Sequence, residues 1–291
     1  MDNIKNGKIV IIGAGHVGSH CGLSLMMQEL ADEIVYIDID ENKAAMQALD
    51  LDDMASNLDR DFVVRAGDYS DCADAQIVVM AAGKSRLPGQ TRLDMFDDSI
   101  KMMNTIVGPL KESGFHGILI SISNPADIIA DFLRKRLELP RNQVFSTGTS
   151  LDSARLRRML SEITGVSRHS IQAYCMGEHG DSQFIPASHV QIGGIPVKEY
   201  LNIHPEVKEK MDFAKISADD KICGFHIVEG KGCTEFGIGA VLSNIACAVM
   251  HDEKRILPVS VLLDGEYGEH GVPAGVPCVI GKNGVEEILE I

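Results

Sequence analysis

Short apolar runs and longer mixed stretches alternate through the first half of the chain. The runs are apolar at consecutive positions, which is typical of parallel strands buried on both faces. They cover 8–13, 33–38, 61–67, 75–83, 117–123 and 143–148. Stretches long enough for helices lie between several of them, at 17–31, 41–57, 94–113 and 126–138. The alternation predicts an α/β protein in which helices doubly wind a parallel sheet, as in a Rossmann-type fold.

The pattern changes near residue 148. Beyond it lie a helix-like stretch and two strand-like segments, at 151–164, 169–176 and 184–192. A later stretch, 264–277, is rich in Gly and Pro. The change predicts two domains, a Rossmann-type domain over 1–147 and an α+β domain over 148–291.

The net charge of the chain excludes two classes of binding partner. The chain of 291 residues has 27 basic and 42 acidic side chains, so its net charge is −15, and its pI is about 5.0. Such a chain repels nucleic acids and anionic membranes, and neither is expected as a partner. An anionic substrate would need a local group of basic residues that works against this field.

Cysteine usage and the N-terminus bear on location. The seven cysteines are an odd number without a CxxC pair, a pattern typical of reduced thiols in a cytosolic protein. The N-terminus lacks the apolar region of a signal peptide, and no apolar run approaches the roughly 18 residues that span a bilayer. We therefore expect a soluble, cytoplasmic protein. The sequence also shows no spacing typical of metal ligands, and no metal is expected.

Three glycines mark a candidate dinucleotide site. Gly13, Gly15 and Gly18 follow the first predicted strand and open a helix, with the spacing GxGxxG. The first permits a tight turn, the second lets a pyrophosphate approach the backbone, and the third lets helix and strand pack closely. Asp38 ends the next strand, 20 residues beyond Gly18. A carboxylate there accepts hydrogen bonds from ribose hydroxyls and repels a 2′-phosphate, so the pattern predicts NAD. The alternative is an ordinary turn followed by a surface Asp.

Candidate chemistry lies in the second half of the chain. His179 stands in the Gly-flanked loop GEHGDS, where its imidazole can reach a ligand. Asp152 and Arg155 are three residues apart in a predicted helix and therefore share one face. The Asp can hold the imidazole tautomer, and the Arg can bind a carboxylate through two hydrogen bonds. By itself, the D-x-x-R pair is equally compatible with an ordinary helix surface.

Seven segments in order resemble one enzyme family. They are GAGHVG, YID, AAG, SNPAD, GTSLDSAR, GEHGDS and KGCTEFG, spread over essentially the whole chain. In this order and approximate spacing they are similar to the NAD-dependent L-lactate and L-malate dehydrogenases. The resemblance implies an NAD-binding domain over 1–147, a substrate-binding domain over 148–291, and a homo-oligomer, either a tetramer or a dimer.

The resemblance also implies roles for individual residues. It gives His179 as the proton acceptor for the 2-hydroxyl, Asp152 as the carboxylate that orients it, and Arg155 as the group that grips the substrate carboxylate. Arg92 matches the arginine of a closing loop that polarises the carbonyl, and Asn124 matches an asparagine beside the nicotinamide and the substrate oxygen. The implied cofactor contacts are Gly13, Gly15, Val17, Gly18, Asp38, Gly83 and Asn124.

The loop AAGKSRLPGQTR bears on which acid is used. Arg86 lies six residues before Arg92, as in malate enzymes, and Gln90 replaces an acidic residue frequent in lactate enzymes. A second carboxylate would pair with Arg86, whereas a methyl group would leave its charge buried and unpaired. Thr234 argues the other way, since it matches lactate enzymes. Malate or oxaloacetate is the first expectation; L-lactate or a branched-chain L-2-hydroxy acid such as hydroxyisocaproate is the alternative.

Three features depart from the family pattern. Arg157 occupies the arginine position of a sugar-phosphate effector site, but Gln172 stands where the histidine would be, which weakens the case for such an effector. The resemblance implies a C-terminal helix of about 25 residues, which the sequence printed here does not contain. The stretch 203–226 lacks the pattern of the family's long helix.

A sensor that binds NAD without turnover is a remote alternative, because it would not need the complete catalytic set.

Overall fold

A parallel sheet forms the first half of the molecule. The structure, a computed structural model, describes residues 7–83 and 96–291. The parallel strands are β1 (Lys8–Ile12), β2 (Glu33–Ile37), β3 (Val63–Ala66), β4 (Ile77–Met80), β5 (Ile118–Ser121) and β6 (Val144–Ser146). Their spatial order is β6-β5-β4-β1-β2-β3, which is that of a Rossmann fold, and the predicted fold class is confirmed.

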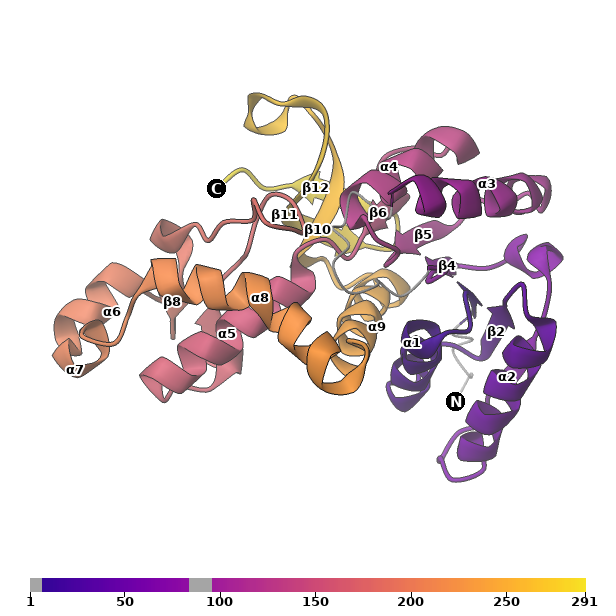
Figure 1. Ribbon diagram of the computed structural model, residues 1–291, viewed down its shortest axis with the longest axis horizontal. Helices are drawn as coiled ribbons and strands as arrows, with labels where there is room; N and C mark the ends of the chain where they lie inside the picture. Colours follow the sequence, from indigo (N-terminus) through magenta and orange to yellow (C-terminus); the bar gives the residue numbers. More distant parts are fainter. Residues whose placement is uncertain (1–6, 84–95) are drawn as a thin grey trace.

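Helices cover both faces of this sheet. They are α1 (His16–Met27), α2 (Glu41–Ala55), α3 (Phe96–Glu112) and α4 (Ala126–Leu137), with a short 3₁₀ turn, η1, at Tyr69–Cys72. Because side chains alternate along a strand, Ile9 and Ile11 join the core under α1 and α2, whereas Val10 and Ile12 join the core under α3 and α4. Figure 1 shows the two helix pairs on either side of the strands.

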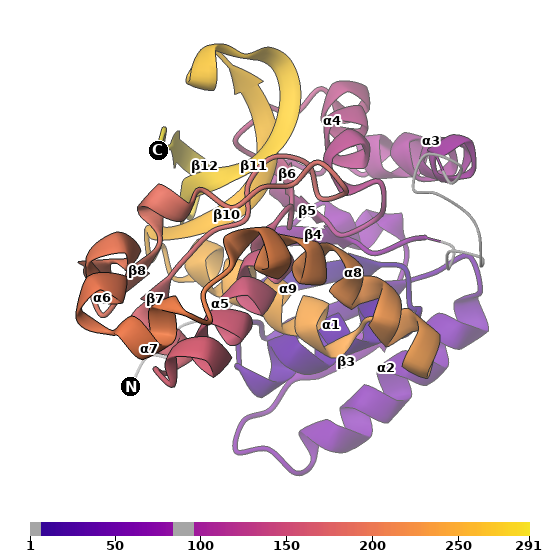
Figure 2. The same cartoon turned by 60° about the vertical axis from the view of Figure 1, so that its left-hand side comes forward.

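Antiparallel strands from the end of the chain extend the same sheet. They are β10 (Arg255–Asp264), β11 (His270–Gly281) and β12 (Gly284–Ile288). β10 pairs with β6 at Ser260 and Ser146, so the described residues form a nine-stranded sheet. In both views these strands stand beyond β6, away from β1–β3 (Figures 1 and 2). The Gly- and Pro-rich stretch 264–277, to which the sequence assigned no strand, forms most of β11 and the turn before it.

Most of the remaining elements surround a third core, whereas α9 (Phe236–Met250) packs with α1 in the first core. The remaining elements are α5 (Ser150–Thr164), η3 (Arg168–Ser170), β7 (Ile171–Gln172), η4 (Ala187–His189), β8 (Gln191–Ile192), β9 (Ile195–Pro196), α6 (Val197–Ile203), α7 (Pro205–Lys208), α8 (Phe213–Lys231), α9 and η5 (Glu266–Gly268). The strands predicted at 169–176 and 184–192 pair only over β7 and β8, plus a bridge between Met176 and Phe184. No helix in the described ranges is both long and apolar enough to cross a membrane.

The stretch 203–226, whose pattern is weak for one long helix, contains the short α7 and most of α8. α8 runs for 19 residues, and the Asp212 side chain caps it by accepting hydrogen bonds from the backbone N–H groups of Ala214 and Lys215 at 3.0 and 3.1 Å. The helix buries only Ile216 and Asp220, and its apolar residues Ile222, Phe225 and Val228 are exposed, so no single apolar face marks it. Weak apolar periodicity follows from this exposure and hid the helix in the sequence.

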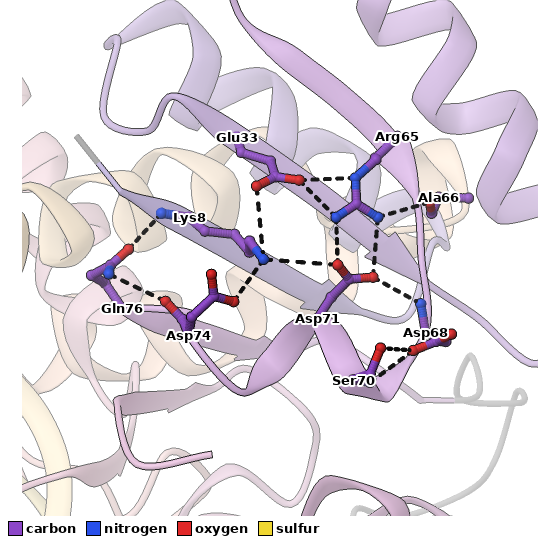
Figure 3. Close-up of polar contacts among 9 residues, drawn as sticks. All are labelled: Lys8, Glu33, Arg65, Ala66, Asp68, Ser70, Asp71, Asp74 and Gln76. Atoms are coloured by element: carbon purple, nitrogen blue, oxygen red, sulfur yellow. Dashed lines mark hydrogen bonds and ion pairs between the residues drawn. The ribbon is translucent and has the colours of Figure 1, made fainter. Parts of the chain in front are cut away.

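An ionic network ties together the amino ends of the strands (Figure 3). Lys8, the first residue of β1, pairs with Asp74 at 2.7 Å. Arg65 of β3 donates from Nε to Glu33 Oε1 at 2.8 Å and pairs with Asp71. The hydrogen bond from Arg65 is the main reason why the pKa of Asp71 is lowered. In open α/β sheets, ligands bind at the carboxyl ends of the strands. The network lies at the opposite edge of the sheet.

Candidate active site

The turn after β1 can be built only with glycine at two positions. Gly13 has φ +108°, and its N–H donates to the Ile37 carbonyl at 2.7 Å. A Cβ at Gly13 would lie 2.6 Å from the carbonyl carbon of Ala81. A Cβ at Gly18 would lie 1.9 Å from the carbonyl oxygen of Gly13. The turn and the close approach of α1 to β1, predicted from the spacing, therefore both require the missing side chains.

Gly15 has a different environment, which suits a phosphate. A Cβ there would meet open space, with Lys43 Nζ at 4.0 Å as its nearest neighbour. Gly15 is the N-cap of α1 and no side chain caps the helix, so the first N–H groups of α1 are available to a ligand. A cradle that a side chain would fill, at the positive end of a helix, fits the pyrophosphate of NAD. Lys43, which sequence reasoning missed, adds a positive charge beside it.

Asp38 is held at the carboxyl end of β2. Its Oδ2 accepts from Ala14 N–H at 2.7 Å, and its Oδ1 accepts from Asp40 N–H at 3.0 Å. These bonds orient the carboxylate beside the glycine turn, and each oxygen keeps a second lone pair that can accept from a ribose hydroxyl. The predicted set Gly13, Gly15, Gly18 and Asp38 is thus brought together.

His179 and Asp152 form a direct pair. The ring Nδ1 lies 2.6 Å from Asp152 Oδ2, and the side chains are 16% and 4% exposed. Asp152 is in the first turn of α5, where the helix dipole favours a carboxylate. With a proton on Nδ1 shared toward Asp152, the lone pair of the neutral imidazole is on Nε2. This arrangement prepares Nε2 to accept a proton from a ligand.

Arg155 lies one helical turn beyond Asp152 and faces the same site. Its Nη1 donates to Asp152 Oδ1 at 3.2 Å, and its side chain is 10% exposed. Gly224 of α8 lies against the guanidinium, since a Cβ there would be 3.4 Å from Nη2. The structure therefore brings together the His, Asp and Arg that the sequence had selected from distant segments.

Asp127 is a site residue that sequence reasoning missed. Its Oδ2 accepts from the backbone N–H of His179 at 2.9 Å, and it is buried in the first turn of α4. Burial is the main cause that raises its pKa. The signal was present in the motif SNPAD, but only the Asn of that motif was singled out. Asp127 positions the loop that carries the imidazole.

Asp220 is a second missed carboxyl, behind the His–Asp–Arg group. It is fully buried, and its Oδ2 accepts from Gln183 Nε2 at 2.7 Å and from Cys175 Sγ at 3.4 Å. Its Oδ1 has no partner among the described residues. Burial, and then the charge of Asp152, raise the pKa of Asp220 to about 6. Nothing local in the sequence marked it, because its neighbours come from three separate segments.

Replacing Asp220 with Asn is expected to stabilise the protein at pH 8 by about 1–3 kcal/mol. The folded pKa of about 6 exceeds the ordinary 3.8. The folded chain therefore holds this proton more tightly, and the stability so gained is present below pH 3.8 and is lost as the pH rises through 6. Asn keeps an acceptor for Gln183 but cannot ionise. Urea unfolding at pH 5 and pH 8 should show the larger gain at pH 8; an equal gain at both would contradict the explanation. Asp219→Asn, on the exposed side of α8, is the control.

The other predicted residues are placed as follows. Asn124 is exposed between β5 and α4, and its carbonyl accepts from Ser99 Oγ at 3.0 Å. Gly83 ends the segment after β4, with open space where a Cβ would be. Val17 is half-buried in the first turn of α1, and Thr234 is half-buried between α8 and α9. Three residues on which the sequence analysis relied lie outside the described ranges: Arg86, Gln90 and Arg92.

Arg157 and Gln172, the predicted effector positions, lie in neighbouring segments. Arg157 Nη1 donates to the carbonyl of Ala173 at 3.3 Å, one residue beyond Gln172. Burial lowers the pKa of Arg157, and Gln172 is exposed on β7. The pair is close, but an uncharged Gln contributes no second cation for a phosphate.

Two family models match the chain over nearly its whole length. The NAD-binding domain of lactate/malate dehydrogenases matches residues 7–146, and the α/β C-terminal domain of the same enzymes matches residues 149–291. Each model contains the residues that the structure gathers: the glycine turn and Asp38 in the first, Asp152, Arg155 and His179 in the second.

Curated relatives and solved structures point in the same direction. An L-lactate dehydrogenase of Fusobacterium nucleatum is 41% identical over 99% of this chain and 90% of its own length. L-lactate dehydrogenase 3 of Bacillus anthracis is 44% identical over 98% and 90%. The ligand-bound minor L-lactate dehydrogenase of Enterococcus mundtii has a TM-score of 0.94 and 36% identity, covering 99% of this chain and 91% of that one. Its unbound form has a TM-score of 0.87, with 35% identity over 100% and 91%.

Proposed function

Because the chain belongs to the lactate/malate dehydrogenase family and is an NAD-dependent 2-hydroxyacid oxidoreductase, we propose that it interconverts L-lactate and pyruvate. The observation that carries the chemistry is the His179–Asp152 pair at 2.6 Å with Arg155 beside it. The choice of acid is supported by the curated relatives and the solved structures, which are L-lactate dehydrogenases. The first expectation, malate or oxaloacetate, has no such support.

The side chains divide the work of the reaction. NAD, when bound, supplies the acceptor for the hydride that leaves C2 of the hydroxy acid. His179 takes the hydroxyl proton at Nε2, and the imidazolium that results is stabilised by Asp152. Arg155 holds the substrate carboxylate through two parallel hydrogen bonds, which orients C2. In the opposite direction His179 returns the proton to the carbonyl oxygen.

The test is a comparison of kcat/KM with NADH for pyruvate, oxaloacetate and 4-methyl-2-oxopentanoate. We expect pyruvate to exceed oxaloacetate at least tenfold, roughly 1.4 kcal/mol of transition-state binding. Arg86→Gln should lower what activity remains with oxaloacetate and leave pyruvate little changed. If the unmodified chain prefers oxaloacetate and Arg86→Gln removes that preference, malate is the substrate after all. A preference for 4-methyl-2-oxopentanoate would favour a branched-chain acid. No turnover with any of the three would leave the NAD-binding sensor.

We also propose the remaining properties on the same grounds. An NAD-binding domain over 1–147 and a substrate-binding domain over 148–291 agree with the limits of the two family matches. A homo-oligomer, tetramer or dimer, and a cytoplasmic location are proposed by analogy with the family. Activation by a sugar phosphate is not proposed, since Gln172 offers no charge.

A further inference from the structure

Three metal-ligand side chains meet outside the proposed catalytic group. His16 is the first residue of α1, while Cys233 and Glu235 flank Thr234 just before α9. Glu235 Oε2 lies 3.6 Å from His16 Nδ1 and 3.3 Å from Cys233 Sγ. All three ligand atoms lie within 4.8 Å of one another.

These separations are close to the edges of a tetrahedral zinc site. Zinc binds sulfur at about 2.3 Å and nitrogen or oxygen at about 2.0–2.2 Å, so tetrahedral ligand atoms stand roughly 3.3–3.6 Å apart. The measured 3.6 Å and 3.3 Å from Glu235 Oε2 match that spacing without a change of backbone. One thiolate, one imidazole and one carboxylate are also a donor set that zinc accepts.

Glu235 is the centre of the cluster and is already arranged as an anion. It is 8% exposed, and Lys231 and Cys233 donate hydrogen bonds to its carboxylate. Lys231 pairs with Oε1, whereas Oε2 faces His16, Cys233 and also His20, whose Nδ1 is 3.5 Å away. One carboxylate oxygen is therefore neutralised, and the other is directed at the candidate ligands.

We propose that His16, Cys233 and Glu235 bind Zn²⁺, with the fourth position open to water, and that occupancy inhibits the enzyme. His16 follows Gly15 of the phosphate cradle directly, and Thr234, predicted to line the substrate pocket, lies between the other two ligands. Zinc would link the start of α1 to the segment 233–235, so that neither could move to fit the cofactor or the substrate. Binding stands independently of the enzyme's reaction; the inhibition rests on the proposed function.

Binding must displace the thiol proton of Cys233, which passes to solvent as the sulfur–metal bond forms.

The experiment titrates Zn²⁺ into the purified full chain against a chromogenic chelator. We expect one equivalent with a dissociation constant on the order of 1 μM or tighter, weakened at least tenfold in Cys233→Ser and in His16→Ala. The matched control is Cys247→Ser, because Cys247, His251 and Glu253 form a second group of ligand type whose His and Glu are exposed. Cobalt(II) should give thiolate charge-transfer absorption that Cys233→Ser removes.

Outcomes separate the site from its effect. Absence of binding, or binding that survives both substitutions or is lost in the control, overturns the site; folding of each variant is checked by thermal unfolding. Zinc should reversibly reduce turnover of the unmodified chain, chelator should restore it, and Cys233→Ser should be at least tenfold less sensitive. Zinc bound at this site without loss of activity overturns the inhibition alone. The binding titration needs no substrate, so it is unaffected if the proposed function fails.

Discussion

Replacing His179 with Asn is expected to lower kcat roughly 10²- to 10⁴-fold while NADH binds almost as before. Asn retains a donor toward Asp152 but has no group that takes a proton near neutral pH. Among the described residues, the hydrogen bonds of Gly13 and Asp38 do not involve His179, so the turn and the carboxylate of the cofactor site keep them. Stopped-flow turnover and NADH fluorescence titration measure the two effects separately.

His189→Asn provides the control for this experiment, because His189 is an exposed histidine of the same half of the chain. It should change neither kcat nor NADH affinity. If the His179 variant retained most of its kcat, another group would be accepting the proton, and the role inferred from the 2.6 Å contact with Asp152 would be wrong.

Replacing Arg155 with Gln should lower kcat/KM for the 2-oxo acid by a factor of similar size. Removing one partner of a buried charge pair costs about 2–5 kcal/mol, which corresponds to roughly 30- to 5,000-fold in kcat/KM. Gln can offer one hydrogen bond to the substrate carboxylate in place of two, and no charge. Steady-state kinetics with pyruvate at saturating NADH provide the measurement.

The matched control is Arg158→Gln on the same helix. Arg158 is paired with Glu162 at 2.8 Å and is far more exposed than Arg155, so its loss should change kcat/KM by less than about twofold. Comparable losses in both variants would mean that α5 was damaged, and the specific role of Arg155 would then be unsupported.

The parts of the fold that the sequence predicted are those with strong local signals. Strands β1, β2 and β4 to β6 are continuous apolar runs, and each carries enough information to be identified alone. β10 to β12 are antiparallel neighbours joined by short turns, and the Gly and Pro residues of 264–277 obscured β11. α8 was missed for a different reason. A helix that buries only two residues shows little periodic spacing of apolar positions.

The candidate site shows the same division. Gly13, Gly18 and Asp38 lie in one local motif, and the spacing alone indicated how they are used. Asp220 and Glu235 depend on neighbours from separate segments, and the contact of Glu235 with His16 joins residues more than 200 positions apart. The preference for malate rested on Arg86, a side chain whose effect depends on what it faces in three dimensions, and sequence alone does not supply that.

The single sheet that runs from β3 to β12 has a mechanical consequence. Since β10 pairs directly with β6, strands from the two halves of the chain are joined by main-chain hydrogen bonds in one sheet. Gly177, two residues before His179, is bonded to Gly275 of β11, so the loop that carries the imidazole is attached to the same sheet as the turn that follows β1. A rigid-body separation of the two halves would have to break these main-chain bonds.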